Sequence, residues 1–407
     1  MATIEKRGNN SYRFRAFDGA GKLQLQSWKA PADLTPKQLE KELARRVALF
    51  EEQVKHGQTA ESTMKLSEFY RFWHDNYAVP HLPPKTVFTY SNLWRRVDDQ
   101  IGHVRVDKLS PSRLQAFYAW LQADAVNAVT GGGLSAKTIH HYHRLISSVL
   151  SYAVELQFIP QNPCERVRPP KQTQKEAYSC SPEQVQRMVA ALDGEPLQFR
   201  TMVLLYLNTG MRKSELHGLQ WPDFDFASGV LRVERELQYL PTTGLQLRPP
   251  KNAKSIRPVK LPVTMCDLLS IWHKEQRHWQ EAMGDRWQED TPAVLKADWM
   301  FTNEFGNPRH PDSFPKRFKQ FLARAGFTPE EVAAIHTHTL RHTNASILIA
   351  ANTNLTTVAK RLGHAQTTTT ANIYAHAIRQ ADEVAAEALD VALHLDSRPT
   401  LREVQRA

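Results

Sequence analysis

The feature that most constrains this fold is a proline-rich stretch in the middle of the chain that lacks any hydrophobic periodicity. It combines four prolines with four basic residues: Pro160, Pro163, Arg166, Arg168, Pro169, Pro170, Lys171 and Lys175. Proline lacks a backbone N–H and disfavours helical geometry in the residue before it. We therefore predict an extended basic linker within 161–177 and a domain boundary near residue 176. The 407 residues suffice for two to four domains.

The first thirty residues alternate in the two-residue period of a β-strand. Tyr12, Phe14 and Ala16 fall on one face, and Arg13 and Arg15 fall on the other. A turn, a second strand and a helix are expected next, over Asp18–Lys22, Leu23–Trp28 and Thr35 to about Gly57. This pattern predicts a small sheet with one helix. Its charged face is either solvated or a nucleic-acid contact.

Residues 63–170 show the period of amphipathic helices. The candidates are Leu66–Tyr77, Thr86–Ile101, Ser110–Gln122 and Ser135–Phe158. The last of these places Ile139, Leu145 and Val149 on a face for burial, and it leaves a basic face that includes Lys137, His140, His141 and Arg144. That face is either solvated or turned toward DNA.

Residues 177–395 mix helical and strand-like patterns. Helices are expected from residue 181 onward and over 197–208, 212–219, 264–283, 313–325, 340–351, 356–362 and 369–377, with strand patterns over 230–239 and 245–261. The segment Arg248–Leu261 is predicted to be a basic hairpin with Lys251 near its tip. A mobile tip of this kind is either a solvated loop or a carrier of the lysine ammonium into a substrate groove.

The charge of the chain favours a polyanionic partner. Lys and Arg number 52 and Asp and Glu number 42, which gives a net charge of +10. No run of about 18 apolar residues is present, and the N-terminus lacks the apolar region of a signal peptide. The cysteines Cys164, Cys180 and Cys266 are too far apart for a CxxC site. We expect a cytoplasmic protein close to nucleic acid.

Two short stretches of the last segment bring basic side chains to positions suited to an anion. In Asn208-Thr-Gly-Met-Arg-Lys-Ser-Glu-Leu216, Gly210 ends one helix and Arg212 begins the next. Free N–H groups at a helix start favour anions, and a guanidinium there can fork onto a phosphate. The second stretch is Arg248–Leu261 with Lys251. Either feature alone is also compatible with an ordinary surface residue.

Two further stretches supply imidazoles and a phenol. In His336-Thr-His-Thr-Leu-Arg-His342, His338 and Arg341 lie three apart, on one face of a helix start. No HExxH and no adjacent carboxylate accompany these histidines, so a metal site is disfavoured. Leu362-Gly-His364 is followed ten residues later by Tyr374, the one tyrosine after Tyr239. A buried core tyrosine is the alternative interpretation of that position.

Together the stretches pose one chemical problem. Arginines, histidines and a lysine accompany a potential nucleophile, and neither an acidic Mg²⁺ site nor a GxxxxGK[ST] phosphate loop is present. Phosphoryl transfer without a metal requires cationic side chains to neutralise the nonbridging oxygens. A nucleophilic tyrosine would form a covalent phosphotyrosine that conserves the energy of the broken DNA phosphodiester. We therefore expect no cofactor, no metal and no nucleotide hydrolysis.

The four stretches, in this order and spacing, resemble the boxes of tyrosine recombinases of the phage-integrase family, close to the integrases of phages and conjugative transposons. The resemblance implies that Tyr374 attacks the scissile phosphate to form a 3′-phosphotyrosine. It implies that Arg212 and Arg341 clamp the nonbridging oxygens and that His364 donates a hydrogen bond to the phosphate. It also implies that Glu215 orients this cluster.

The remaining roles concern proton transfer. The resemblance implies that Lys251 protonates the departing 5′-oxygen, with Lys254 as the competitor because hairpin lengths vary. His338 is expected to transfer a proton with the nucleophile or to position it. His342 is expected to be structural, and the additional His336 has no assigned role.

The resemblance also implies an architecture. The expected fold class is multidomain α+β, with a small sheet-plus-helix arm-binding domain, an all-α core-binding domain, and a mainly α catalytic domain with a small antiparallel sheet. The expected bounds are 1–60, 63–168, a linker over 169–176, and 177–395 with a tail to 407. An apolar-faced helix over 384–395 would pack on a neighbouring protomer.

The implied partner is double-stranded DNA, at core and arm attachment sites. The expected DNA contacts are basic side chains of all three domains: Arg13, Arg15, Lys137, His141, Arg144 and Arg257. A place on a strand of the hairpin is the alternative for Arg257. The family implies a homotetramer on DNA, an excisionase and a DNA-bending protein, and a location on the nucleoid of a bacterial host. The activity expected is site-specific integration and excision of a mobile element or prophage. A type IB topoisomerase and a non-catalytic DNA-binding protein are the alternatives.

Overall fold

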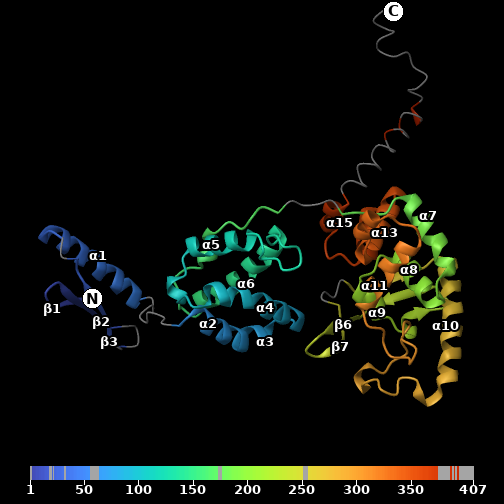
Figure 1. The fold of residues 1–407 in the computed structure, drawn as a ribbon, viewed down its shortest axis with the longest axis horizontal. Helices are drawn as coiled ribbons and strands as arrows, with labels where there is room; N and C mark the ends of the chain where they lie inside the picture. The colour runs from blue at the N-terminus through green and yellow to red at the C-terminus, as the bar shows by residue number, and fades with distance from the viewer. Residues whose placement is uncertain are drawn as a thin grey trace, which may run out of the picture. The chain divides into compact units, whose positions relative to one another are not determined.

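Two compact units make up the chain, Met1–Gln174 and Lys175–Ala407 (Figure 1). The computed structural model describes residues 2–17, 21, 23–31, 34–55, 64–172, 177–250 and 255–374, together with 386, 389, 392 and 393. The helix expected over 384–395 therefore lies largely outside the described residues. Among the described helices, none is long and apolar enough to cross a membrane.

The first unit begins with a three-stranded antiparallel sheet in the order β1-β2-β3. The strands and the helix that follows them are β1 (Thr3–Gly8), β2 (Ser11–Phe17), β3 (Leu23–Lys29) and α1 (Pro36–Lys55). Phe14 and Ala16 pack against Phe50 and Val54 of α1, so the predicted buried face of β2 is confirmed. On the opposite face Arg15 is exposed.

The rest of the first unit is helical. Its helices are α2 (Leu66–Trp73), α3 (Val79–His81), α4 (Pro84–Val97), α5 (Pro111–Gln122) and α6 (Ala136–Glu155), with π-helical turns at His74–Ala78 and Asp98–Gly102. Ser110 and Ser135 cap α5 and α6 by accepting a backbone N–H three residues on. The apolar stripe of α6 is buried, and Lys137, His141 and Arg144 are exposed, as its periodicity predicts.

The beginning of the proline-rich stretch differs from the extended linker that its sequence predicts. Pro163–Arg166 forms a 3-10 turn, and Val167 is buried against the helices. Asn162 Nδ2 donates to the Ser147 carbonyl at 3.0 Å, and His140 Nε2 donates to the Pro170 carbonyl at 2.9 Å. One bond is thus accepted by α6 and the other is donated by α6, and together they anchor this segment to the first unit.

The second unit is mainly helical, with two small antiparallel sheets. Its helices are α7 (Pro182–Ala191), α8 (Leu197–Thr209), α9 (Lys213–His217), α10 (Val263–Met283), α11 (Ser313–Arg324), α12 (Pro329–Ala334), α13 (Thr337–Ala350), α14 (Leu355–Leu362) and α15 (Thr367–Ile373). α8 is buried nearly all round and packs on α10 and α13. α12 is a helix that the sequence patterns did not predict.

The strand pairing corrects the hairpin expected over Arg248–Leu261. The strands are β4 (Phe224–Asp225), β5 (Val230–Val233), β6 (Glu236–Leu240), β7 (Gly244–Arg248) and β8 (Arg257–Lys260). β7 pairs with β6, whereas β8 pairs with β5. The prediction of a hairpin was therefore wrong: residues 249–256 connect two sheets. Two-residue periodicity identifies strands but does not say which strands pair.

Gly210 makes the turn on which the position of the first box depends. It ends α8 in the left-handed region, with φ of 59°, and its N–H donates to the Tyr206 carbonyl at 2.8 Å. A Cβ at this position would lie 2.6 Å from Leu362 Cδ2 and 2.7 Å from Asn344 Oδ1. Both the dihedral angle and the close approach of α13 and α14 therefore require glycine.

We predict that Gly210→Ala lowers the stability of the second unit by about 1–3 kcal/mol, because the new methyl group is strained and also displaces its neighbours. The measurement is the thermal midpoint by differential scanning calorimetry. Gly194→Ala is the matched control, since a Cβ there meets open space. Equal midpoints for the two variants would contradict the requirement for glycine.

Candidate active site

The first box begins a helix directly after the Gly210 turn. Arg212 is the N-cap residue of α9, and Glu215 is the third residue of that helix. Glu215 Oε2 accepts the Arg212 backbone N–H at 2.8 Å, and Oε1 accepts from Arg212 Nη1 at 2.6 Å. The same carboxylate thus fixes the start of α9 and the direction of the guanidinium.

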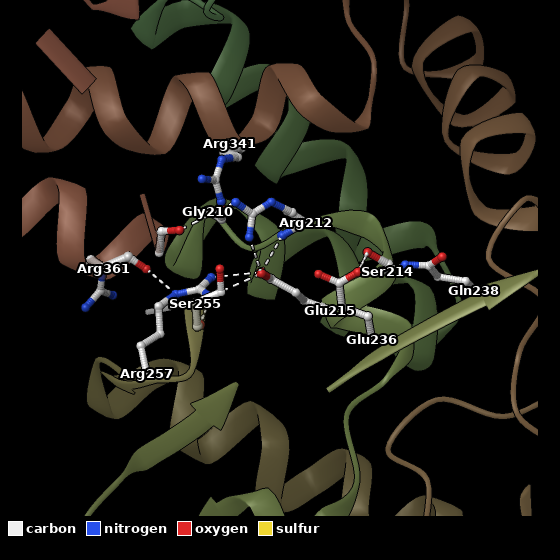
Figure 2. Close-up of polar contacts among 11 residues, drawn as sticks. Gly210, Arg212, Ser214, Glu215, Glu236, Gln238, Ser255, Arg257, Arg341 and Arg361 are labelled. Atoms are coloured by element: carbon white, nitrogen blue, oxygen red, sulfur yellow. Dashed lines mark hydrogen bonds and ion pairs between the residues drawn. The ribbon is translucent and has the colours of Figure 1, made fainter. Parts of the chain in front are cut away.

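The Glu215 carboxylate also binds a second arginine (Figure 2). Arg257 of β8 donates from Nη1 to Oε1 at 3.2 Å and from Nη2 to Oε2 at 2.8 Å. Glu215 is fully buried and Arg257 is 5% exposed. Burial raises the pKa of Glu215, but the hydrogen bonds and charges of Arg257 and Arg212 outweigh it, so the pKa lies below its ordinary value.

Arg257 joins two further segments to this carboxylate. Its Nε donates to the Arg361 carbonyl at 2.6 Å, and Nη1 donates to the Ser255 carbonyl at 2.9 Å (Figure 2). The sequence prediction placed Arg257 either on a strand of the hairpin or on the DNA backbone; here it lies on β8, with its guanidinium in the protein interior. The alternation of β8 contains the signal, because Arg257 shares the buried face of Val259.

Arg341 reaches the same cluster from α13. It is 2% exposed, and Nη1 donates to the Gly210 carbonyl at 2.7 Å (Figure 2). Burial, followed by the positive charge of Arg212, lowers the pKa of Arg341 to about 10. The cluster has a net charge of +2, because three arginines (Arg212, Arg257 and Arg341) carry +3 and Glu215 carries −1. An incoming phosphodiester would offset this partly buried excess of positive charge.

The Gly-His box lies against Arg212. Gly363 ends α14 in the left-handed region, with φ of 69°, and its carbonyl accepts from Arg212 Nη2 at 3.5 Å. The next residue, His364, shares a 2.8 Å hydrogen bond between Nδ1 and Thr370 Oγ1. Burial and then the charges of Arg341 and Arg212 lower the pKa of His364 to about 4. Its imidazole is therefore neutral at pH 7.

Tyr374 follows α15 and is 3% exposed. Its ring packs among residues of α13 and α14, including Ile349 and Leu362. Burial raises the pKa of Tyr374 to about 12, and the nearby Arg341 opposes that rise. The hydroxyl shares a hydrogen bond of 2.9 Å with His342 Nδ1. His342, expected to be structural, thus contacts the candidate nucleophile itself, which nothing in the sequence indicated.

The two other histidines of this box have separate positions. His338 lies one helical turn before His342, and the two rings meet edge to face with centroids 4.9 Å apart. Burial, followed by the charges of His342 and Arg341, lowers the pKa of His338 to about 4. His336 is the N-cap residue of α13, and its Nδ1 accepts the Thr339 backbone N–H at 3.1 Å. Capping α13 accounts for the histidine that had no assigned role.

The remaining predicted residues fall outside this cluster. Lys251 and Lys254 lie outside the described residues. Arg13, Arg15, Lys137, His141 and Arg144 belong to the first unit. The structure therefore brings together Arg212, Glu215, Arg341, His364 and Tyr374, with His338 beside them. Among the described residues, no group of three or more His, Cys, Asp or Glu side chains is arranged to hold a metal ion.

We predict that Arg257→Gln destabilises the second unit by about 3–5 kcal/mol, because it leaves the buried Glu215 carboxylate without its bidentate partner. The thermal midpoint measures this loss, and Arg232→Gln on the exposed face of β5 is the control. Adding Glu215→Gln to Arg257→Gln is expected to recover part of the midpoint. An unchanged midpoint in the single variant would contradict the interpretation.

Comparison with known sequences matches both units of the chain. The sequence model of the phage integrase family matches residues 179–380, and that of the phage integrase SAM-like domain matches residues 78–168. A XerC-like tyrosine recombinase of Caldanaerobacter subterraneus subsp. tengcongensis is 28% identical over 325 residues, which are 75% of this chain and 78% of that protein. The ICEBs1 integrase of Bacillus subtilis is 27% identical over 63% of this chain and 66% of its own length.

Solved structures show the same fold. The Tn1549 transposon integrase, in complex with a circular intermediate DNA, superposes with a TM-score of 0.65 at 20% identity, covering 80% of this chain and all of that one. A lambda integrase from a tetramer bound to a Holliday junction gives 0.53 at 16% identity, covering 90% of this chain and 96% of that one. With two family models matching most of its length, this chain belongs to the phage integrase family of tyrosine recombinases, enzymes that cut and rejoin DNA at specific sites.

Proposed function

We propose that Tyr374 attacks the scissile phosphate of a DNA strand and that Arg212, Arg341 and His364 hold its nonbridging oxygens. The observation that carries this proposal is the convergence of these side chains, from α9, α13, the end of α14 and the end of α15, on one cationic cluster around Glu215. Two guanidiniums can stabilise the charge that spreads over a phosphoryl group in the transition state.

The proposed reaction occurs in two transesterifications. The Tyr374 oxygen forms a bond to phosphorus as the bond to the 5′-oxygen breaks, which leaves a 3′-phosphotyrosine. A 5′-hydroxyl then attacks this ester and releases the tyrosine. One phosphodiester is exchanged for another ester at each step, so neither ATP nor a metal ion is required.

The departing 5′-oxygen needs a proton. We assign this role to Lys251, with Lys254 as the alternative donor. In support, residues 251–254 come directly before Ser255 in the sequence. Arg257 donates hydrogen bonds to the Ser255 carbonyl and to the Glu215 carboxylate. His338 has a positioning role beside the nucleophile in this scheme.

The first unit supplies candidate DNA surfaces. The exposed Lys137, His141 and Arg144 on α6 form a basic face for backbone contacts at the core site. The face of β2 that carries Arg13 and Arg15 suits the major groove at an arm site. Residues 1–60, 63–168 and 177–395 then serve as arm-binding, core-binding and catalytic domains, with 169–176 as the linker.

The biological substrate we propose is a pair of attachment sites on a mobile element and its host chromosome, in the cytoplasm of a bacterium. In support, the similar Bacillus subtilis protein is named an ICEBs1 integrase and a structural neighbour is a Tn1549 transposon integrase. A homotetramer on paired sites would perform the exchange. An excisionase and a DNA-bending protein would set its direction.

We predict that the wild-type chain forms a covalent complex with a nicked suicide duplex, in buffer containing EDTA, and that Tyr374→Phe forms none. The missing phenol oxygen leaves no nucleophile, while the ring still fills the same space. The duplex carries the attachment site from DNA that flanks the gene, and a denaturing gel measures the adduct. Mass spectrometry that finds the nucleotide on another residue would overturn the assignment.

We predict that Arg212→Ala and Arg341→Ala each reduce the cleavage rate at least about 10²–10³-fold, because each removes donors to the transition-state charge. DNA affinity, measured by gel shift at fixed salt, should change little, since many other phosphate contacts remain. Arg232→Ala, on the exposed face of β5, is the control. Loss of binding in parallel with cleavage would show that the clamp role is wrong.

A further inference from the structure

The roles proposed above for the active-site residues do not account for the hydrogen bond between Tyr374 and His342. It joins the phenol oxygen to Nδ1 at 2.9 Å, and the two rings meet with centroids 5.6 Å apart at 62°. Among the described residues, His342 Nδ1 is the basic atom found within hydrogen-bond distance of the candidate nucleophile. The partner of His342 Nδ1 is therefore the phenol oxygen of Tyr374, the atom that would attack phosphorus.

Strand cleavage requires a destination for the phenol proton. The lysine of 251–254 is needed to give a proton to the 5′-oxygen, so a second group must accept one. Glu215 is occupied by Arg212 and Arg257, and His364 Nδ1 is bonded to Thr370. We propose that His342 is the general base of the reaction, accepting the Tyr374 proton at Nδ1 as the phenol oxygen attacks phosphorus. This inference rests on the proposed function, in which Tyr374 is the nucleophile.

The environment of His342 supports this role. Burial and then the positive charges of Arg341 and His336 lower the pKa of His342 to about 4, so the ring is neutral and Nδ1 can accept when Nε2 carries the proton. His338 contacts the ring edge to face, 4.9 Å between centroids, which restricts its rotation. Both histidines lie on α13 together with Arg341, so one helix positions the proposed base and one arginine of the proposed clamp.

The proposed proton transfers balance. In cleavage, the O–H bond of Tyr374 breaks, a bond between its oxygen and phosphorus forms, and the proton passes to His342 Nδ1. The bond between phosphorus and the 5′-oxygen breaks, and that oxygen takes a proton from the lysine. In rejoining, the 5′-hydroxyl returns its proton to the lysine, and His342 returns its proton to the tyrosine.

The test compares His342→Asn with the wild type in single-turnover cleavage of the nicked suicide duplex. The asparagine amide oxygen lies near the place of Nδ1 and accepts the same hydrogen bond, but it cannot take a proton. We expect cleavage to fall about 10²–10⁴-fold. The thermal midpoint and DNA affinity should be retained. Tyr374→Phe is the control, because without the phenol oxygen it reports the uncatalysed background.

A second arm separates proton transfer from structural support. A fluorinated tyrosine of lower pKa at position 374 needs less help to lose its proton. It should therefore restore cleavage in His342→Asn by about tenfold or more, and by much less in the native background. Equal effects in the two backgrounds, or wild-type cleavage by His342→Asn, would overturn the role of His342. Absence of any Tyr374 adduct in the wild type would instead overturn the proposed function.

A third measurement does not depend on the folding of a His342 variant. In full-length protein with ¹⁵N-labelled histidine, His342 Nδ1 should give the resonance of an unprotonated acceptor, and Tyr374→Phe should shift it. A protonated Nδ1, or a resonance that Tyr374→Phe leaves unchanged, would refute the proposed proton transfer.

Discussion

The buried carboxylate of Glu215 is the contact on which the arrangement of the active site depends. It receives the backbone and side chain of Arg212 and both terminal nitrogens of Arg257. A lone carboxylate at this depth would be strongly unfavourable, and so would the buried Arg257 guanidinium without it. Glu215 and Arg257 are therefore stable in the interior because each pairs with the other. Arg257 extends the network to the Arg361 carbonyl, two residues before Gly363.

The arginines of this network differ in what their positive charges contact. Arg257 directs its donors to Glu215 and to backbone carbonyls, so it serves the protein. Arg212 keeps a side chain that is 34% exposed, which leaves it accessible to a phosphate. Arg341 is nearly buried, yet its charge acts on Arg212 and Tyr374. The same residue type thus supports the framework at one position and keeps an accessible guanidinium at another.

Much of the fold could be predicted because local periodicity decides it. The faces of β2 and α6 follow from the alternation around Phe14 and the helical spacing around Leu145. The helix starts at Ser110 and Ser135 follow from capping chemistry. Strand pairing could not be predicted in this way, because β5 meets β8 across a segment of chain that includes β6 and β7. Contacts between distant segments leave no local pattern.

The same limit applies to the site. Short motifs identified Arg212, Arg341, His364 and Tyr374 because their order and spacing are specific. The sequence predicted a structural role for His342. Its hydrogen bond to Tyr374, 32 positions later, depends on how α15 ends beside α13, and no local pattern reveals that. For Arg257 the charge suggested a DNA contact, while its place in the alternation of β8 indicates the buried strand position that the structure shows. In both cases tertiary placement decides the role.

The distance along the chain between the parts of this cluster has a consequence for synthesis in the cell. Arg212 and Tyr374 are separated by 374 − 212 = 162 residues. A ribosome that has produced the arginine must add another 162 residues before the phenol exists. On the proposed mechanism, a nascent polypeptide that ends before residue 374 lacks the nucleophile, so it cannot form the covalent bond to DNA.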